Sequence, residues 1–138
     1  MTLNPESRKP PLIAIVDDDE SMRASLEGLL RATGYQARTY GGGDEFLDSE
    51  GPTKARCLIS DIQMPGMCGV DLHKALCARG LHIPVIFITA YPGARPQVTA
   101  DLPGVVACLP KPFEAERLLA CIEDALGHRH SPFPPASA

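Results

Sequence analysis

Apolar and polar residues follow one another along the chain in blocks that predict short strands separated by helices. Five stretches have the length and pattern of strands, at residues 12–16, 35–40, 57–60, 85–89 and 105–109. The first of them, Leu-Ile-Ala-Ile-Val, is apolar at every position, which is typical of a strand buried on both faces of a sheet. The pattern therefore predicts a five-stranded sheet with a buried centre.

The segments between these stretches carry helical periodicity. After the first stretch, apolar residues recur at a 3.6-residue period and the pattern ends near Gly34. Residues 41–48 predict a loop, a helix cap at Asp44 and a short helix with Phe46 and Leu47 facing inward. Residues 70–80 and 114–127 each predict a helix with one apolar face and a terminal glycine. In the last of these, the residues predicted to be buried are Leu118, Leu119, Ile122, Ala125 and Leu126.

Strand and helix thus alternate five times, which predicts an α/β fold with a parallel sheet and helices on both faces, because crossovers between parallel strands are right-handed. The segment 91–104 contains three prolines, so any helix there is expected to be short or irregular. Residues 1–10 predict a flexible lead-in, residues 11–127 the folded domain and residues 128–138 a disordered tail. Nothing after Gly127 is expected to form a second domain.

Composition narrows the class of protein. The 138 residues are 44% hydrophobic and 22% charged, which is typical of a globular domain. A net charge of −4 gives no reason to expect nucleic-acid binding through a basic face, and no apolar run approaches the roughly 20 residues of a membrane helix. Five cysteines without a Cys-x-x-Cys pair predict neither a disulfide framework nor a zinc site. We expect a soluble, cytoplasmic protein.

Polar residues gather where the predicted strands end. In open parallel sheets, ligands bind beyond the carboxyl ends of the strands, so side chains at these positions are expected to meet at one edge. The residues at these ends are Asp17, Asp18, Asp19 and Glu20 after the first strand, Asp61 after the third, Thr89 and Ala90 after the fourth, and Lys111 after the fifth.

These residue types predict phosphoryl chemistry around a metal ion. Grouped carboxylates repel one another unless a cation joins them, and hard oxygen ligands without histidine or cysteine favour Mg²⁺, with Mn²⁺ as the alternative. A carboxylate beside such an ion can attack phosphorus and form an acyl phosphate. Lys111, held between Pro110 and Pro112, would be the distal cation. Each residue alone is ordinary at a strand end or turn; their coincidence at successive strand ends favours a site.

In combination, the motifs resemble the receiver domain of two-component response regulators. They are Ile-Val-Asp-Asp-Asp-Glu at 15–20, Asp-Ile-Gln-Met-Pro-Gly-Met-Cys-Gly at 61–69, Ile-Thr-Ala at 88–90 and Lys-Pro-Phe at 111–113. The resemblance covers about residues 10–127. It implies a flavodoxin-like, doubly wound sheet with strand order 2-1-3-4-5.

The resemblance also implies roles for single residues. Asp61 would accept the phosphoryl group from a histidine kinase or phosphotransfer protein, and later lose it by slow hydrolysis. Asp18 would bind Mg²⁺ directly, with Asp17 acting mainly through water, and Asp61 and the backbone carbonyl of Gln63 would complete the ligands. Thr89 would bind the phosphoryl group and Lys111 would pair with it. The supporting residues would be Ala90, Pro65, Gly69 and Pro112, the last after a cis bond; Asp19 is expected in the first turn of a helix.

The sequence departs from this family at the position that relays the signal. In the family, a threonine and an aromatic residue on the fifth strand move together on phosphorylation, and they shift a surface made by the segment after the fourth strand, the fifth strand and the last helix. Here the switch pair is Thr89 and Cys108, and a cysteine has no ring to expose or bury. Tyr91 lies two residues past Thr89, where side chains can influence dephosphorylation. The output relay is therefore expected to differ from the usual one.

Three functions are compatible with the sequence. The favoured one is a phosphorylatable receiver that switches protein contacts with an unknown downstream partner, as a stand-alone regulator, a phosphate sink in a relay or a fragment of a longer protein. The second is a receiver-like interaction module that works without phosphorylation. The third is a metal-dependent phosphatase, disfavoured by Gln63 where such enzymes commonly carry a second aspartate. The last helix is compatible with a homodimer, but core packing explains its apolar face equally well.

Overall fold

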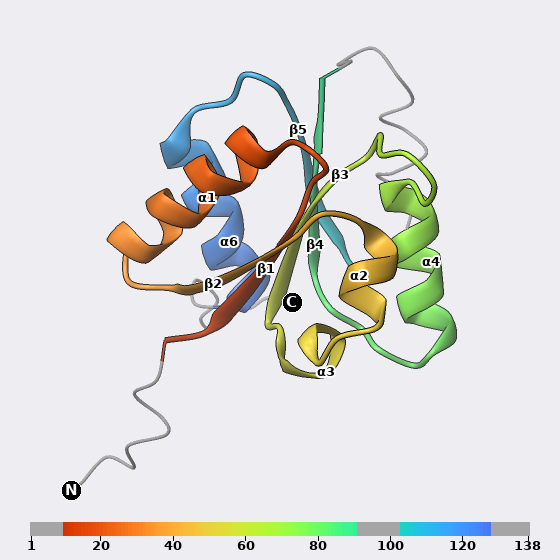
Figure 1. Cartoon of the computed structure of the whole chain (residues 1–138). Coiled ribbons are helices and arrows are strands. Elements are labelled where there is room, and N and C mark those ends of the chain that lie inside the picture. The colour runs from red at the N-terminus through yellow and green to blue at the C-terminus, as the bar shows by residue number, and fades with distance from the viewer. Residues whose placement is uncertain (1–9, 91–102, 128–138) are drawn as a thin grey trace, which may run out of the picture.

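The computed structural model describes residues 10–90 and 103–127, and its centre is a five-stranded parallel sheet (Figure 1). The strand order is β2-β1-β3-β4-β5, which confirms the order and fold class expected from the sequence. The strands are β1 (Leu12–Val16), β2 (Gln36–Tyr40), β3 (Cys57–Asp61), β4 (Val85–Thr89) and β5 (Val105–Pro110).

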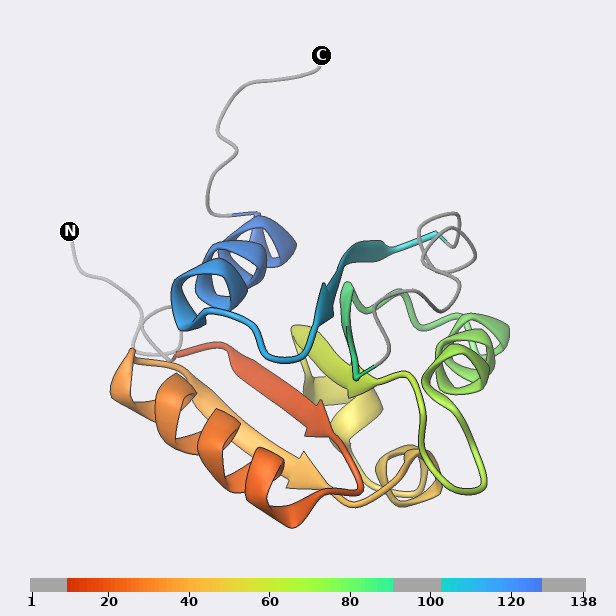
Figure 2. The same ribbon diagram turned by 90° about the horizontal axis from the view of Figure 1, so that it is seen from above.

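Helices cover both faces of the sheet, as the view from above shows (Figure 2). One face packs against α1 (Glu20–Ala32) and α6 (Ala115–Leu126), and the other against α2 (Gly43–Leu47), α3 (Gly51–Lys54) and α4 (Gly69–Ala78). Among the described residues, the longest of these helices has 13 residues, and none is long and apolar enough to cross a membrane.

The alternation of side chains along β1 divides the core in two. Ile13 and Ile15 face the cluster beneath α1 and α6, whereas Ala14 and Val16 face the cluster beneath α2 and α4. The central strands β3 and β4 are buried at every position because helices cover both of their faces. Cys57 is part of this core, and burial raises the pKa of its thiol to about 12, so it acts as a small apolar residue.

The helix boundaries differ from the predicted ones where a helix is short. The N-cap of α2 is Gly42, so the predicted cap Asp44 lies inside the first turn, where its carboxylate still favours the positive end of the helix. Helix α3 has four residues and was not predicted, because one turn is too short to show a period. In α6, Leu118 and Ile122 are fully buried; Leu119, Ala125 and Leu126, which were predicted to be buried, are only partly so.

Strand β5 contains one residue more than its neighbour can pair. Val105 pairs with Val85 and Ala107 with Ile86, so Val106 is a β-bulge. Val106 is correspondingly exposed, at 36% of its maximum. Beyond the bulge the ladder continues to the pair of Thr89 with Pro110, one residue past the predicted end of the strand.

Three expectations fall on residues outside the described ranges. The flexible lead-in and the disordered tail lie there almost entirely, and so does most of the proline-rich segment 91–104, including Tyr91. The domain boundaries at residues 11 and 127 therefore remain predictions.

Candidate functional site

The carboxyl ends of four neighbouring strands meet at one edge of the sheet and bring the predicted residues together. Asp17 directly follows β1, Asp61 and Thr89 end β3 and β4, and Lys111 directly follows β5. The register holds these ends level, because Asp61 pairs with Ile88 and Thr89 with Pro110. The site is thus built by the parallel ladder itself.

Lys111 reaches across this edge to two carboxylates. Its Nζ atom lies 3.3 Å from Oδ2 of Asp61 and 3.5 Å from Oδ2 of Asp17. Its backbone amide donates to the carbonyl of Thr89 at 2.7 Å, which anchors the residue to the end of β4. The Lys111–Pro112 bond is cis, as the family resemblance implied.

Three aspartates form the acidic side of the site. Asp17, Asp18 and Asp61 each offer a carboxylate oxygen within 4.8 Å of the others, and only Asp18 is exposed. Three carboxylates and one ammonium group leave a formal charge of −2, which a divalent cation would neutralise. All three ligands are hard oxygens, so the residues fit Mg²⁺.

The electrostatics of the buried groups reflect this crowding. Burial raises the pKa of Asp17 and the charge of Asp61 adds to the rise, while the amide of Asp19 and the Lys111 ammonium act in the opposite direction. Burial alone would lower the pKa of Lys111, but the carboxylates of Asp61 and Asp17 outweigh it and raise that pKa. Lys111 is therefore held firmly in its charged form, whereas the surroundings of Asp17 on balance oppose its ionisation.

Asp17 is held by three hydrogen bonds, two through its backbone and one through its carboxylate. Its amide donates to the carbonyl of Tyr40 at 3.1 Å, and its Oδ1 accepts the amide of Asp19 at 2.9 Å. Its carbonyl accepts Nη1 of Arg23 at 2.7 Å. Asp19 is the N-cap of α1, one residue before the first turn where it was expected, and accepts the amides of Ser21 and Met22.

The loop after β3 holds Asp61 from the other side. The amide of Gln63 donates to Oδ1 of Asp61 at 3.0 Å, whereas the use of its carbonyl as a metal ligand remains a prediction. Gly69 opens α4 directly against this loop: a Cβ atom there would lie 2.5 Å from the carbonyl oxygen of Asp61. The amide of Gly69 also donates to the carbonyl of Ile62 at 2.8 Å, so glycine closes the loop tightly; Pro65 is exposed within it.

The predicted switch residues occupy the neighbouring strands. Thr89 is 4% exposed at the end of β4, and Ala90 after it is exposed. Cys108 on β5 is partly buried against the cluster on the α4 face, opposite Phe87 in the ladder. Their roles as a switch remain predictions.

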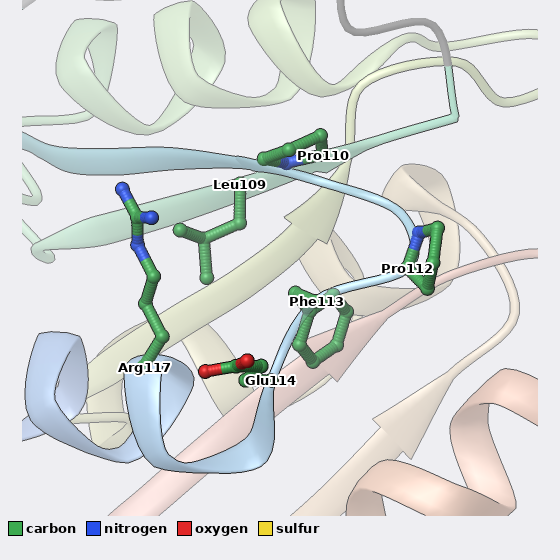
Figure 3. Close-up of a pocket in the computed structure, with 6 residues that line it drawn as sticks. All are labelled: Leu109, Pro110, Pro112, Phe113, Glu114 and Arg117. Carbon is green, nitrogen blue, oxygen red and sulfur yellow. The ribbon is translucent and has the colours of Figure 1, made fainter.

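The two prolines around Lys111 line a different surface. A cavity of about 290 Å³ between the end of β5 and the start of α6 is lined by Leu109, Pro110, Pro112, Phe113, Glu114 and Arg117 (Figure 3). Lys111 is not among these residues, because its ammonium group points to the carboxylates instead. The prolines thus turn the chain so that one residue faces the acidic site while its neighbours face the cavity.

Arg23 is the residue of this site that the sequence did not reveal. Its bond goes to a backbone carbonyl, which every residue carries, so no pattern of residue types marks it. Its position on the first full turn of α1 was the only signal that the sequence held.

Comparisons with known proteins identify a family and a fold for this chain. Residues 13–123 match the family described as the response regulator receiver domain. The chain is 36% identical over 117 residues to nodulation protein W of Bradyrhizobium diazoefficiens and 34% identical over 115 residues to the transcriptional regulatory protein FixJ of Azorhizobium caulinodans. These matches cover 85% and 83% of the chain but only 52% and 54% of the two relatives, so the chain spans about half of their length.

A solved structure gives the same result for the fold. The crystal structure of a response regulator receiver protein from Burkholderia phymatum superposes with a TM-score of 0.74 and is 41% identical. The superposition covers 85% of this chain and 95% of that chain.

Proposed function

The chain belongs to the receiver domain family of two-component response regulators, and from this membership we propose that it accepts a phosphoryl group on Asp61 in phosphorelay signalling. The donor would be a histidine kinase or a phosphotransfer protein. The observation that carries the proposal is the position of the Lys111 ammonium group between the carboxylates of Asp61 and Asp17, at 3.3 and 3.5 Å. A lysine in this position lies where charge on a phosphoryl group beside Asp61 would develop.

The proposed reaction uses each residue at its observed place. A carboxylate oxygen of Asp61 attacks phosphorus, the bond from phosphorus to the donor's imidazole nitrogen breaks, and the imidazole leaves with a proton. Gln63 orients Asp61 through the hydrogen bond that its backbone amide donates to Oδ1. Lys111 pairs with the transferred phosphoryl oxygens, and the hydroxyl of Thr89, at the end of the adjoining strand, binds one of them.

Asp17, Asp18 and Asp61 would hold Mg²⁺, or Mn²⁺ in its place, with the carbonyl of Gln63 as a further ligand. The ion, when bound, neutralises charge on the phosphoryl oxygens. Asp18 is the exposed member, so it lies where an ion entering from solvent first meets a carboxylate. The buried Asp17 is already occupied by the Asp19 amide and by Lys111, which supports a role for it mainly through water.

The output is proposed to be a change in protein contacts. Phosphorylation would draw in Thr89, and Cys108 on β5 would respond by a small shift in packing, because it has no ring to rotate. Turnover would be limited to self-phosphorylation and slow loss of phosphate. The comparisons do not favour the interaction module without phosphorylation, and the match to receiver domains likewise gives no support to the phosphatase.

The experiment is phosphorylation of the whole chain, read by intact mass. Purified kinases or a small acyl phosphate, each with Mg²⁺, are expected to add one phosphoryl group to the wild type and none to Asp61→Asn. The matched control is Asp48→Asn, which changes an exposed aspartate at the C-cap of α2 and should be phosphorylated normally. Absence of any mass gain in the wild type, or an equal gain in Asp61→Asn, would contradict the proposal.

A further inference from the structure

We propose that Arg23 is a positioning residue that fixes the peptide between Asp17 and Asp18 and thereby prepares the acidic cluster for a divalent cation. This inference rests on the proposed function, since it concerns the same cluster. It starts from one contact, the hydrogen bond of 2.7 Å from Nη1 of Arg23 to the carbonyl of Asp17.

That carbonyl lies just beyond the last residue of β1 in the ladder, because Val16 is the final residue of β1 that pairs with β2 and β3. The carbonyl of Asp17 and the amide of Asp18 belong to one planar peptide unit. A donor that fixes this carbonyl therefore fixes the plane from which both carboxylate-bearing residues project. Arg23 supplies that donor.

The backbone that carries the guanidinium group is fixed. The amide of Arg23 donates to the carbonyl of Asp19 at 3.0 Å, in the first turn of α1, which Asp19 caps. A Cβ atom on Gly41 would lie 3.7 Å from Nη1 of Arg23 and 3.3 Å from Oε1 of Glu45. Glu45 accepts the amide of Gly41 at 3.0 Å, so Arg23 sits between the loop that follows β1 and the loop that follows β2.

Arg23 fixes the backbone and does not bind the carboxylate oxygens that would hold the ion. Its bond goes to a carbonyl, so the carboxylate oxygens of Asp17 remain with Asp19 and Lys111. Its planar guanidinium group presents donors in a fixed geometry, which suits a lasting contact with one oxygen. Groups of this kind, which touch the ligand-bearing residues without touching the ion, commonly set metal affinity.

The chain contains a matched control on the same helix. Arg31, in the last turn of α1, also donates to a backbone carbonyl: its Nη2 lies 3.0 Å from the carbonyl of Ala37 on β2. Arg31 therefore joins α1 to the sheet as Arg23 does, but at the end of the helix away from the acidic cluster. Alanine is the best helix former, so both alanine variants keep α1.

The test compares Arg23→Ala, Arg23→Lys and Arg31→Ala in the full chain. Mg²⁺ is titrated and the shifts of the backbone amides of Asp18 and Asp61 are followed by NMR; thermal unfolding is measured separately in EDTA. We expect Arg23→Ala to weaken Mg²⁺ binding roughly tenfold, as loss of a supporting contact commonly does. Arg23→Lys keeps one donor and should lie between the alanine variant and the wild type. Arg31→Ala should lower stability and leave the Mg²⁺ affinity unchanged.

Two results would overturn the inference alone: Arg23→Ala binding Mg²⁺ as tightly as the wild type, or Arg31→Ala weakening Mg²⁺ binding as much as Arg23→Ala. The second would mean that general loosening of α1 explains the effect. A wild type that shows no amide shifts at millimolar Mg²⁺ would overturn the proposed function together with this inference.

Discussion

At the scale of single residues, the site places more carboxylate groups than ammonium groups in a buried position. Two carboxylates, of Asp17 and Asp61, face one ammonium group, and burial opposes ionisation of Asp17 and of Lys111. Lys111 gains from both neighbours, so its pKa rises in spite of burial. Asp17 loses more from burial and from Asp61 than it gains from its partners, so its pKa also rises. Ionisation of Asp17 therefore costs the folded protein stability.

This cost predicts that Asp17→Asn stabilises the protein in the absence of metal. A carboxyl group whose pKa is higher in the folded state binds its proton more tightly there. Its favourable contribution to the stability of the fold is therefore complete below pH 3.8 and is lost as the pH rises through the raised pKa. At pH 7 the variant should gain on the order of 1 kcal/mol in the free energy of unfolding. Urea unfolding of the variant and the wild type in EDTA measures this difference in the free energy of unfolding.

The gain should shrink as the pH falls through the raised pKa of Asp17 and should vanish below pH 3.8, where Asp17 is protonated in both states. The exposed Asp48 provides a control, since Asp48→Asn removes a carboxylate that is not buried. A stability gain of Asp17→Asn that did not depend on pH would mean that the buried charge is not its cause. The pKa of Lys111 is raised above 10.5, so its favourable contribution to stability is expected to be lost only above pH 10.5.

Residue types at strand ends were enough to predict Asp17, Asp18, Asp61, Thr89 and Lys111 as neighbours, because parallel strands bring their carboxyl ends to one edge. They were not enough to find Arg23, or the N-cap role of Asp19. Both depend on hydrogen bonds between a side chain and the backbone. Such bonds form only if the helix starts at one particular residue. The apolar pattern does not define the first residue of a helix that accurately.

At the scale of helices and strands, burial decides what the sequence can predict. Strands β1, β3 and β4 are buried at nearly every position, so their apolar runs matched the observed bounds to within one residue. The one-turn helix α3 and the bulge at Val106 were missed. A single helical turn is too short to show a period in the sequence. One extra residue in a strand leaves its apolar pattern almost unchanged, so a bulge cannot be read from it. The bulge nevertheless fixes the register in which Pro110 pairs with Thr89.

The start of α4 offers a prediction about how elements fit together. Gly69→Ala would place a methyl group 2.5 Å from the carbonyl oxygen of Asp61, so the helix or the end of β3 must move. We expect a loss of about 1–3 kcal/mol in the free energy of unfolding, the usual cost of overpacking, and weaker Mg²⁺ binding because Asp61 moves with its strand. Urea unfolding and the NMR titration measure the two effects.

Gly28→Ala is the matched control for this change. Gly28 lies within α1, and a Cβ atom there meets nothing within 4 Å. The same substitution should therefore stabilise the protein by roughly 0.5–1 kcal/mol through helix propensity. If Gly69→Ala proved as harmless as Gly28→Ala, the tight closure of the loop after β3 would not be needed to hold Asp61.

At the scale of the whole molecule, the acidic edge makes stability depend on cations. The chain carries a net charge of −4, and three of its carboxylates crowd into one cluster with a single lysine. A fold that holds like charges together is destabilised by their repulsion, and an ion that binds only the folded state offsets that repulsion. The proposed metal site and the stability of the domain are therefore linked.

This linkage predicts that Mg²⁺ raises the free energy of unfolding of the wild type, by about 2.7 kcal/mol when its concentration is 100 times the dissociation constant. Asp18→Asn should abolish most of the rise; because Asp18 is exposed, the substitution disturbs no packing. NaCl at equal ionic strength should give a much smaller effect, since screening is not site binding. Urea unfolding in EDTA, NaCl and MgCl₂ separates these contributions. Equal stabilisation of the wild type and Asp18→Asn by Mg²⁺ would show that the ion acts on the overall charge of the protein and that the three aspartates do not form a site.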